Sequence, residues 1–155
     1  MLTVHGQQVR VAVRSGSGPG RPLVLCNGIG AGLELLAPFV AELDATRQVV
    51  RFDVPGVGGS PEPAIPYSFP GLAWFLGELL DELGYDEVDL LGVSWGAGAL
   101  VQQFAFQHSQ RCGRLVLVAT ATGSLMVPAR LDVLAKMADT RRYRDREYAA
   151  PSRAR

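Results

Sequence analysis

Histidine and cysteine are scarce in this chain of 155 residues, which contains two of each. Cys26 and Cys112 stand in no C-x-x-C or metal-ligand spacing, so the sequence predicts neither a disulfide framework nor a metal site. We expect a reduced, cytoplasmic protein that uses no metal and no cofactor. His5 and His108 are the only imidazoles in the chain that could act as a general base.

An excess of either charge is also missing, because 15 basic residues balance 15 acidic ones. The overall balance therefore favours no nucleic acid, anionic membrane or acidic substrate as a partner. No segment approaches the roughly 18 apolar residues of a membrane-spanning helix. The N-terminus has no basic start followed by an apolar stretch, so we expect no signal peptide.

The sequence does contain apolar segments of two alternating kinds, after a short opening meander and a glycine-rich loop at residues 16–20. Continuous apolar runs predict strands at residues 23–26, 49–53, 88–91 and 115–118. Apolar stripes at helical spacing predict helices from Leu36 through Phe39 and Val40 to Leu43, from Ser68 to Gly84, and from Ser94 to about His108. This order predicts one α/β domain, with a mostly parallel sheet and helices on both faces.

A G-x-S-x-G pattern lies where one of these strands meets the next helix, at Gly92-Val93-Ser94-Trp95-Gly96. A serine on so sharp a turn is held in a strained backbone conformation, and Gly92 and Gly96 leave room for the strand and helix to approach. We therefore predict that Ser94 is the nucleophile of ester hydrolysis. The alternative is a glycine-rich turn with an incidental serine.

Nucleophilic attack on an ester places negative charge on oxygen, so the site needs backbone donors close to that atom. We predict two such donors, the N–H of Trp95 at the start of its helix and the N–H of Ile29 in the loop after residues 23–26. In that loop Asn27 and Gly28 have structural roles. The alternative for residues 27–30 is a plain turn.

Asp53 stands at a strand end, but the catalytic acid of this fold follows the nucleophile in sequence. We therefore predict that Asp53 satisfies backbone donors of its own loop. Neither histidine is a convincing base. His108 lies ~20 Å from Ser94 along a helix that rises ~1.5 Å per residue, and His5 precedes the whole sheet. Cys26 is predicted to be a small core residue.

These motifs together resemble the intracellular medium-chain-length poly(3-hydroxyalkanoate) depolymerases of the α/β-hydrolase superfamily. The resemblance implies a three-layer α/β-hydrolase fold, in which Ser94 forms an acyl-enzyme and water releases 3-hydroxyalkanoic acids or short oligomers from polyester granules. It is carried by residues 26–31 (Cys-Asn-Gly-Ile-Gly-Ala), 33–35, 52–60 (Phe-Asp-Val-Pro-Gly-Val-Gly-Gly-Ser), 66–73, 92–96, 102–105, 114–117, 119–123, 126–128 and 141–143.

Members of this family continue through a lid, further strands, an aspartate and a histidine that have no counterpart here. Residues 149–155 also stop resembling the family, so we expect a truncated, frameshifted or split reading frame. On this interpretation residues 1–123 are the N-terminal part of the hydrolase domain, and residues 124–155 are the start of the lid and a divergent basic tail.

Three functions stay open. The first is a polyester depolymerase whose acid and base come from further polypeptide, with the granule surface as a partner. The second is a generic esterase or acyltransferase that acts on small esters. The third is an inactive fragment that at most binds hydrophobic polyester or another protein, and whose strand at residues 115–119 has an unpaired edge that favours self-association.

Overall fold

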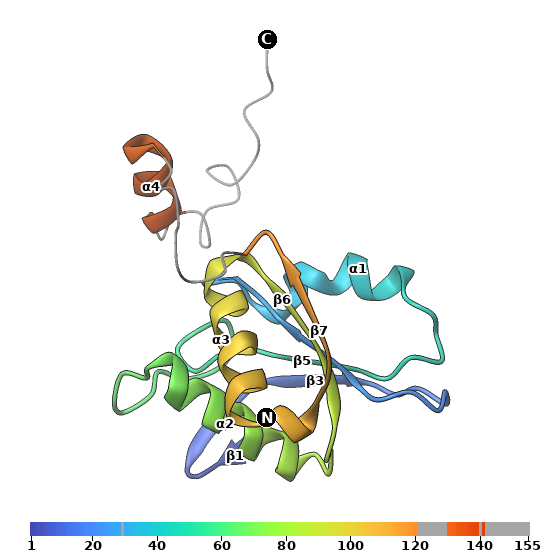
Figure 1. Cartoon of the computed structure of the whole chain (residues 1–155). Helices are drawn as coiled ribbons and strands as arrows, with labels where there is room; N and C mark the ends of the chain where they lie inside the picture. Colours follow the sequence, from blue (N-terminus) through green and yellow to red (C-terminus); the bar gives the residue numbers. More distant parts are fainter. Residues whose placement is uncertain (29, 121–129, 140, 142–155) are drawn as a thin grey trace. The chain divides into compact units, whose positions relative to one another are not determined.

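The computed structural model describes residues 1–28, 30–120, 130–139 and 141 (Figure 1). Packing divides the chain into two units, Met1–Ala121 and Thr122–Arg155. In the second unit the described residues contain one helix, α4 (Leu131–Ala138). The predicted boundary between residues 123 and 124, and the predicted divergent tail, lie outside the described residues and stay predictions.

The first unit is built on a five-stranded sheet with the order β3-β5-β4-β6-β7. Strands β4 to β7 run parallel to one another, whereas β3 pairs antiparallel with β5. A separate hairpin of β1 and β2 precedes this sheet. The strands are β1 (Leu2–Val4), β2 (Gln7–Val9), β3 (Val11–Arg14), β4 (Leu23–Cys26), β5 (Val49–Phe52), β6 (Val88–Val93) and β7 (Cys112–Val118). The predicted, mostly parallel sheet is confirmed.

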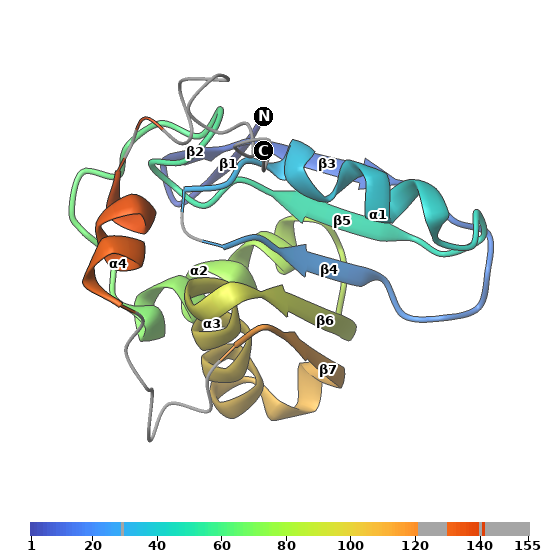
Figure 2. The ribbon, with the colours of Figure 1, turned by 90° about the horizontal axis from the view of Figure 1, so that it is seen from above.

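Helices cover both faces of this sheet (Figure 2). The first face carries α2 and α3, and the second carries α1, which gives three layers. The helical elements of this unit are η1 (Leu33–Leu36), α1 (Ala37–Glu42), α2 (Phe69–Glu82), α3 (Ser94–Gln107) and the short η2 (Ser109–Arg111).

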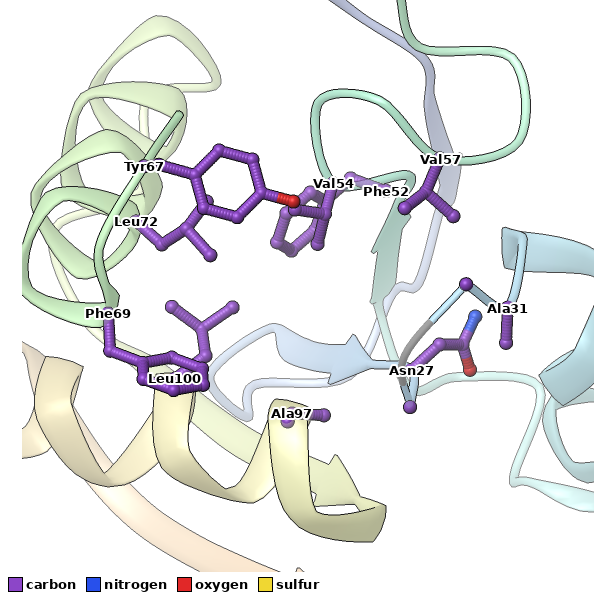
Figure 3. A pocket seen from close by; sticks show the side chains of 13 residues that line it. Asn27, Ala31, Phe52, Val54, Val57, Tyr67, Phe69, Leu72, Ala97 and Leu100 are labelled. Carbon is purple, nitrogen blue, oxygen red and sulfur yellow. The ribbon is translucent and has the colours of Figure 1, made fainter. Parts of the chain in front are cut away.

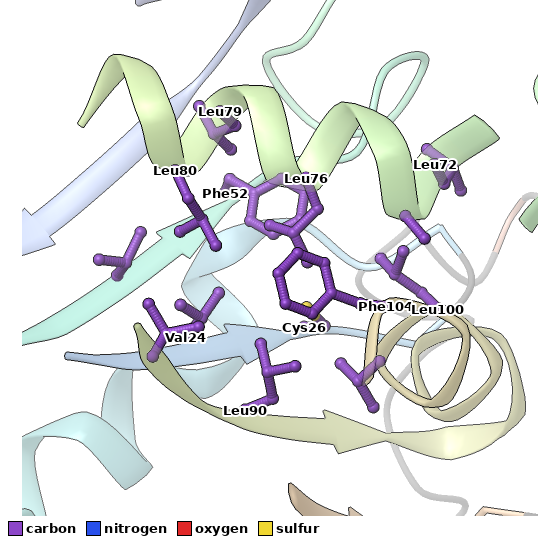
Figure 4. Packing of buried hydrophobic residues seen from close by; sticks show 14 of the residues in the cluster. Val24, Cys26, Phe52, Leu72, Leu76, Leu79, Leu80, Leu90, Leu100 and Phe104 are labelled. Atoms are coloured by element: carbon purple, nitrogen blue, oxygen red, sulfur yellow. The ribbon is translucent and has the colours of Figure 1, made fainter. Parts of the chain in front are cut away.

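Alternate residues of β4 enter two different cores because successive side chains of a strand point to opposite faces. Val24 and Cys26 pack beneath α2 and α3, in the cluster that contains Phe104 (Figure 4). Leu23 and Leu25 pack on the other face with Val40 of α1. A strand buried on both faces has a continuous apolar sequence, which is the pattern that predicted β4.

The ends of α2 follow its sequence signals. The Ser68 hydroxyl accepts a hydrogen bond from the Gly71 N–H at 3.2 Å, and Gly84 has a φ of +74° just past the last turn. The prediction for α1 was less accurate. The helix begins at Ala37, directly after the separate 3-10 helix η1 and close to the predicted start at Leu36, but Phe39 is 40% exposed instead of facing the sheet.

Strand β7 lies at one end of the strand order and pairs only with β6 among the described strands. Four consecutive apolar residues of β7, Leu115 to Val118, are 37 to 45% exposed. Its outer edge therefore combines unpaired backbone groups with apolar side chains, a combination that favours pairing with another strand. No helix in the described parts of the chain is long and apolar enough to cross a membrane.

Candidate active site

Ser94 occupies the sharp turn between β6 and α3. Strand β6 ends at Val93 and α3 begins at Ser94 itself, with no residue between them. Ser94 has a φ of +70°, in the left-handed region that non-glycine residues rarely adopt. Such a conformation persists only where the surrounding structure enforces it, and it is common at functional sites. The partly exposed serine lies at the carboxyl end of β6, the edge where parallel sheets bind ligands.

Glycines allow α3 to approach the sheet closely behind this turn. A Cβ on Gly92 would lie 2.7 Å from Cγ2 of Val101 and 2.9 Å from the carbonyl oxygen of Ala97. A Cβ on Gly98 would overlap the side chain of Thr120. The small residues around Ser94 are therefore required by the packing of α3 against β6 and the end of β7.

The loop after β4 runs directly beside Ser94. A Cβ on Gly28 would lie 3.0 Å from Cβ of Ser94 and 3.4 Å from its Oγ. The next residue, Ile29, lies outside the described residues, so its predicted role as an oxyanion donor stays a prediction. Asn27 supports the loop from within, because its Nδ2 donates to the Gly32 carbonyl at 2.7 Å.

Trp95 follows Ser94 in the first turn of α3, where backbone N–H groups have no intrahelical partner. These N–H groups lie at the positive end of the helix dipole, which stabilises a developing negative charge. The Trp95 ring points away from the core and is 42% exposed. It packs edge-on against Phe69 of α2, with ring centroids 5.5 Å apart.

Asp53 lies at the end of β5 with its side chain fully buried. Its Oδ1 accepts the Leu33 N–H at 2.6 Å, and its Oδ2 accepts the Gly59 N–H at 2.8 Å. Oδ2 also accepts Nε of Arg10 at 2.5 Å. The Asp53 carboxylate thus joins the loop after β5 to Leu33, the first residue of η1. Leu33 follows the loop after β4, which is the loop that passes beside Ser94.

Arg10 is a component of this network that the sequence patterns do not indicate. Besides Asp53 it binds both carboxylate oxygens of Glu34, at 2.7 and 2.8 Å. Hydrogen bonds to Glu34 and then Asp53 raise the pKa of Arg10, and the Arg10 guanidinium lowers the pKa of Glu34. Only the antiparallel pairing of β3 with β5 brings Arg10 next to Asp53, and that pairing has no local sequence signal.

The structure brings neither histidine to Ser94. Nε2 of His5 lies 2.6 Å from Oε2 of Glu78, and its ring stacks on Trp74 of α2. His108 follows the last residue of α3, at the opposite end of that helix from Ser94, and packs on Phe104. Neither residue can take the proton of Ser94 from these positions.

A cavity of about 260 Å³ (Figure 3) is lined on one side by Gly28, and the contact of Gly28 with Ser94 places this cavity beside the serine. Two of its walls flank the serine: the loop after β4 and the first turn of α3. The remaining walls are mostly hydrocarbon and come from α2, α3 and the loop after β5. The lining residues are Asn27, Gly28, Gly30, Ala31, Phe52, Val54, Val57, Tyr67, Phe69, Leu72, Gly96, Ala97 and Leu100. Apolar cavities with a few polar groups at one end are typical of small-molecule sites.

Cys26, which the sequence predicts to be a small core residue, is 2% exposed beneath α2 and α3. Burial raises the pKa of its thiol to about 12. The thiolate is the reactive form of cysteine, so Cys26 is unreactive at neutral pH.

Comparison with known proteins agrees with this architecture. The family described as alpha/beta hydrolase fold matches residues 21–153, and the chain belongs to that family. The chain is 54% identical over 142 residues to the poly(3-hydroxyalkanoate) depolymerase of Ectopseudomonas oleovorans, covering 92% of this chain and 50% of that protein. It is 36% identical over 121 residues to the 2-hydroxy-6-oxo-2,4-heptadienoate hydrolase of Pseudomonas putida, covering 76% and 44%.

Solved structures agree as well. The enol-lactonase from Burkholderia xenovorans superimposes with a TM-score of 0.70 at 30% identity, over 76% of this chain and 45% of that one. A hydrolase from Pseudomonas aeruginosa gives a TM-score of 0.71 at 28% identity, over 90% and 52%. The predicted fold class is confirmed, and the chain spans about half the length of the curated relatives it matches.

Proposed function

We propose that this chain carries the nucleophile and the oxyanion donors of a serine ester hydrolase that acts on poly(3-hydroxyalkanoate). The backbone of Ser94 is the observation that carries the proposal. A φ of +70° at the junction of β6 and α3 is the conformation that presents a serine hydroxyl at the top of an α/β-hydrolase sheet. The neighbouring cavity supplies an apolar site next to that hydroxyl.

The proposed reaction begins when Oγ of Ser94 attacks the ester carbonyl carbon and loses its proton to a general base. The carbonyl oxygen becomes negatively charged and accepts hydrogen bonds from the N–H groups of Trp95 and Ile29. The tetrahedral intermediate then expels the hydroxyl end of the next polyester unit, which takes the proton. Water hydrolyses the resulting acyl-enzyme and releases a 3-hydroxyalkanoic acid or a short oligomer. These steps use no cofactor.

The catalytic acid and base of this proposal come from polypeptide beyond these 155 residues, because His5 and His108 both pack elsewhere. The chain would then be a truncated, frameshifted or split form of the whole enzyme, with residues 1–123 as its N-terminal part and residues 124–155 as the start of the lid and a divergent basic tail. In this proposal, five residues hold the backbone around Ser94 and take no part in proton transfer: Asp53, Gly28, Asn27, Gly92 and Gly96.

The proposed substrate rests on the 54% identity to a protein named poly(3-hydroxyalkanoate) depolymerase. The apolar lining of the cavity beside Ser94 supports it, because the repeating unit of such a polyester carries an alkyl group. We propose accordingly that the protein acts in the cytoplasm at the surface of polyester granules. Self-association through the outer edge of β7 is a separate proposal that concerns the chain on its own.

Two alternatives differ from this proposal in substrate or in activity. A generic esterase or acyltransferase would use the same serine on small esters, as the structural likeness to an enol-lactonase allows. An inactive fragment would keep the turn and the cavity but transfer no acyl group. The positions of His5 and His108 favour this second alternative for the chain on its own.

A fluorophosphonate probe tests the role of Ser94. We expect a slow adduct confined to Ser94 and absent from Ser94→Ala, because the backbone donors remain while the base is missing. Ser109→Ala, at the other end of α3, is the matched control and should label like the unmodified chain. An adduct that persists in Ser94→Ala, or no adduct at all, would contradict the proposal. Rapid labelling would contradict the view that the base lies outside this chain.

A further inference from the structure

A second hollow lies next to the cavity beside Ser94, and the two share a wall. The second hollow has a volume of about 420 Å³ and is lined by Tyr67, Ser68, Phe69, Pro70 and Leu72. Tyr67, Phe69 and Leu72 also line the cavity beside Ser94. These three residues, at the start of α2 and just before it, therefore form a partition between the two spaces.

The cavity beside Ser94 has two chemically different ends. Backbone and one amide side chain line the end next to the serine, at Asn27, Gly28 and Gly30. Tyr67 and Leu72 lie across the cavity from Asn27 and Ala31 (Figure 3). An ester carbonyl at Ser94 would therefore direct an attached alkyl group away from the polar end and toward the partition.

Each side chain of the partition is held by a different part of the fold. The Tyr67 hydroxyl donates to the Pro55 carbonyl at 3.0 Å, which ties it to the loop after β5. The Phe69 ring packs edge-on against Trp95, next to the nucleophile. Leu72 is 6% exposed and belongs to the core beneath α2 and α3. Tyr67 is 42% exposed, and each of the three side chains contacts another part of the folded unit.

We propose that Tyr67, Phe69 and Leu72 limit the length of the alkyl group of the 3-hydroxyacyl unit bound at Ser94. The inference rests on the proposed function, because that function places an acyl unit at Ser94. The volume of about 260 Å³ lies just below the range of small-molecule sites, which is roughly 300 to 1,000 Å³. The second hollow, which shares these three lining residues, offers further space to an alkyl group that extends past them.

The test measures binding of free 3-hydroxyalkanoic acids, from 3-hydroxybutyrate to 3-hydroxydodecanoate, to the full chain by NMR titration. Each added methylene that becomes buried should raise the affinity about fourfold. We expect this rise to stop once the cavity is filled. In Phe69→Ala and Tyr67→Ala the rise should continue to longer acids, because the partition is opened. Thermal melting of the same samples shows that each variant is folded.

Ile65→Ala is the matched control, because Ile65 is 78% exposed and lines neither space. It should keep the length limit of the unmodified chain. The inference would be overturned if the length limit were the same in Phe69→Ala, in Tyr67→Ala and in the unmodified chain. It would also be overturned if the affinity did not depend on the length of the acid. Binding needs no catalysis, so Ser94→Ala should show the unmodified length limit. If the length limit shifts in Phe69→Ala and Tyr67→Ala but a fluorophosphonate probe labels no serine, the proposed function is wrong. The inference that the partition limits the length of the bound acid is then still supported.

Discussion

Gly28 lies against Ser94 so closely that a Cβ on the glycine would be 3.0 Å from Cβ of the serine. Gly28 lies in the loop after β4, and Ser94 is the first residue of α3 directly after β6, so two positions far apart in the sequence meet at the carboxyl ends of neighbouring strands. This contact sets the distance between the nucleophile and the loop that holds the predicted donor Ile29. The position of that loop is therefore as important to the proposed chemistry as the serine itself.

Replacing Gly28 with alanine should slow fluorophosphonate labelling of Ser94 roughly tenfold to a hundredfold, because either the loop or the serine must move. Gly71→Ala is the matched control. A Cβ there would meet only the Ser68 hydroxyl at 3.4 Å, an ordinary contact, so its labelling rate should not change. Equal rates in the two variants, measured by mass spectrometry over time, would show that the loop does not position the serine.

The strained backbone of Ser94 predicts an unusual order of stability. At a positive φ alanine is strained and glycine is not, so Ser94→Gly should have a free energy of unfolding about 1 kcal/mol higher than Ser94→Ala. At Ser109, which has no positive φ, the order should reverse, with glycine the less stable. Denaturant unfolding measures all four variants. A Ser94→Ala variant at least as stable as Ser94→Gly would exclude strain at this turn.

The buried carboxylate of Asp53 should be a large contributor to stability. Asp53→Ala leaves the Leu33 and Gly59 N–H groups and the Arg10 guanidinium without their acceptor. We expect a loss of about 3 kcal/mol in the free energy of unfolding. Asp81→Ala removes an exposed pair with Arg111 and should cost less than about 1 kcal/mol. A similar cost for both, measured in urea, would contradict the central role of Asp53.

The outer edge of β7 should drive self-association. Val116 is 45% exposed there, and Val116→Lys should shift the chain toward a monomer in size-exclusion chromatography, because charge on an edge strand opposes pairing. Phe106→Lys is the control, since Phe106 is 83% exposed but belongs to α3. A monodisperse monomer for the unmodified chain, or equal effects of the two variants, would rule out association through β7.

Much of the fold follows from local sequence patterns. The apolar runs of β4 to β7 and the capped, striped helix α2 predicted a mostly parallel sheet covered on both faces. The G-x-S-x-G pattern predicted the turn at Ser94, because three properties of that turn are local: a strand before it, a helix after it and glycines around it.

Other parts depend on contacts that a single sequence does not encode locally. Arg10 joins Asp53 only because β3 pairs with β5, and Phe39 is 40% exposed although it belongs to the apolar stripe that predicted α1. The partition combines Tyr67, which precedes α2, with Phe69 and Leu72 of α2. Tyr67 contacts Pro55 and Phe69 contacts Trp95, and neither contact has a local sequence signal. Helical spacing alone predicts a core position for Leu72 but no cavity.

The central claim is that Ser94 accepts the acyl group of a 3-hydroxyalkanoate ester. The most direct measurement incubates the chain with the p-nitrophenyl ester of 3-hydroxyoctanoic acid and locates the acyl group by peptide mass spectrometry. We predict that a 3-hydroxyoctanoyl adduct accumulates on Ser94 and is absent from Ser94→Ala, because neither histidine of this chain can activate water to remove it. An acyl group on other residues, or ester turnover that Ser94→Ala leaves unchanged, would contradict the account.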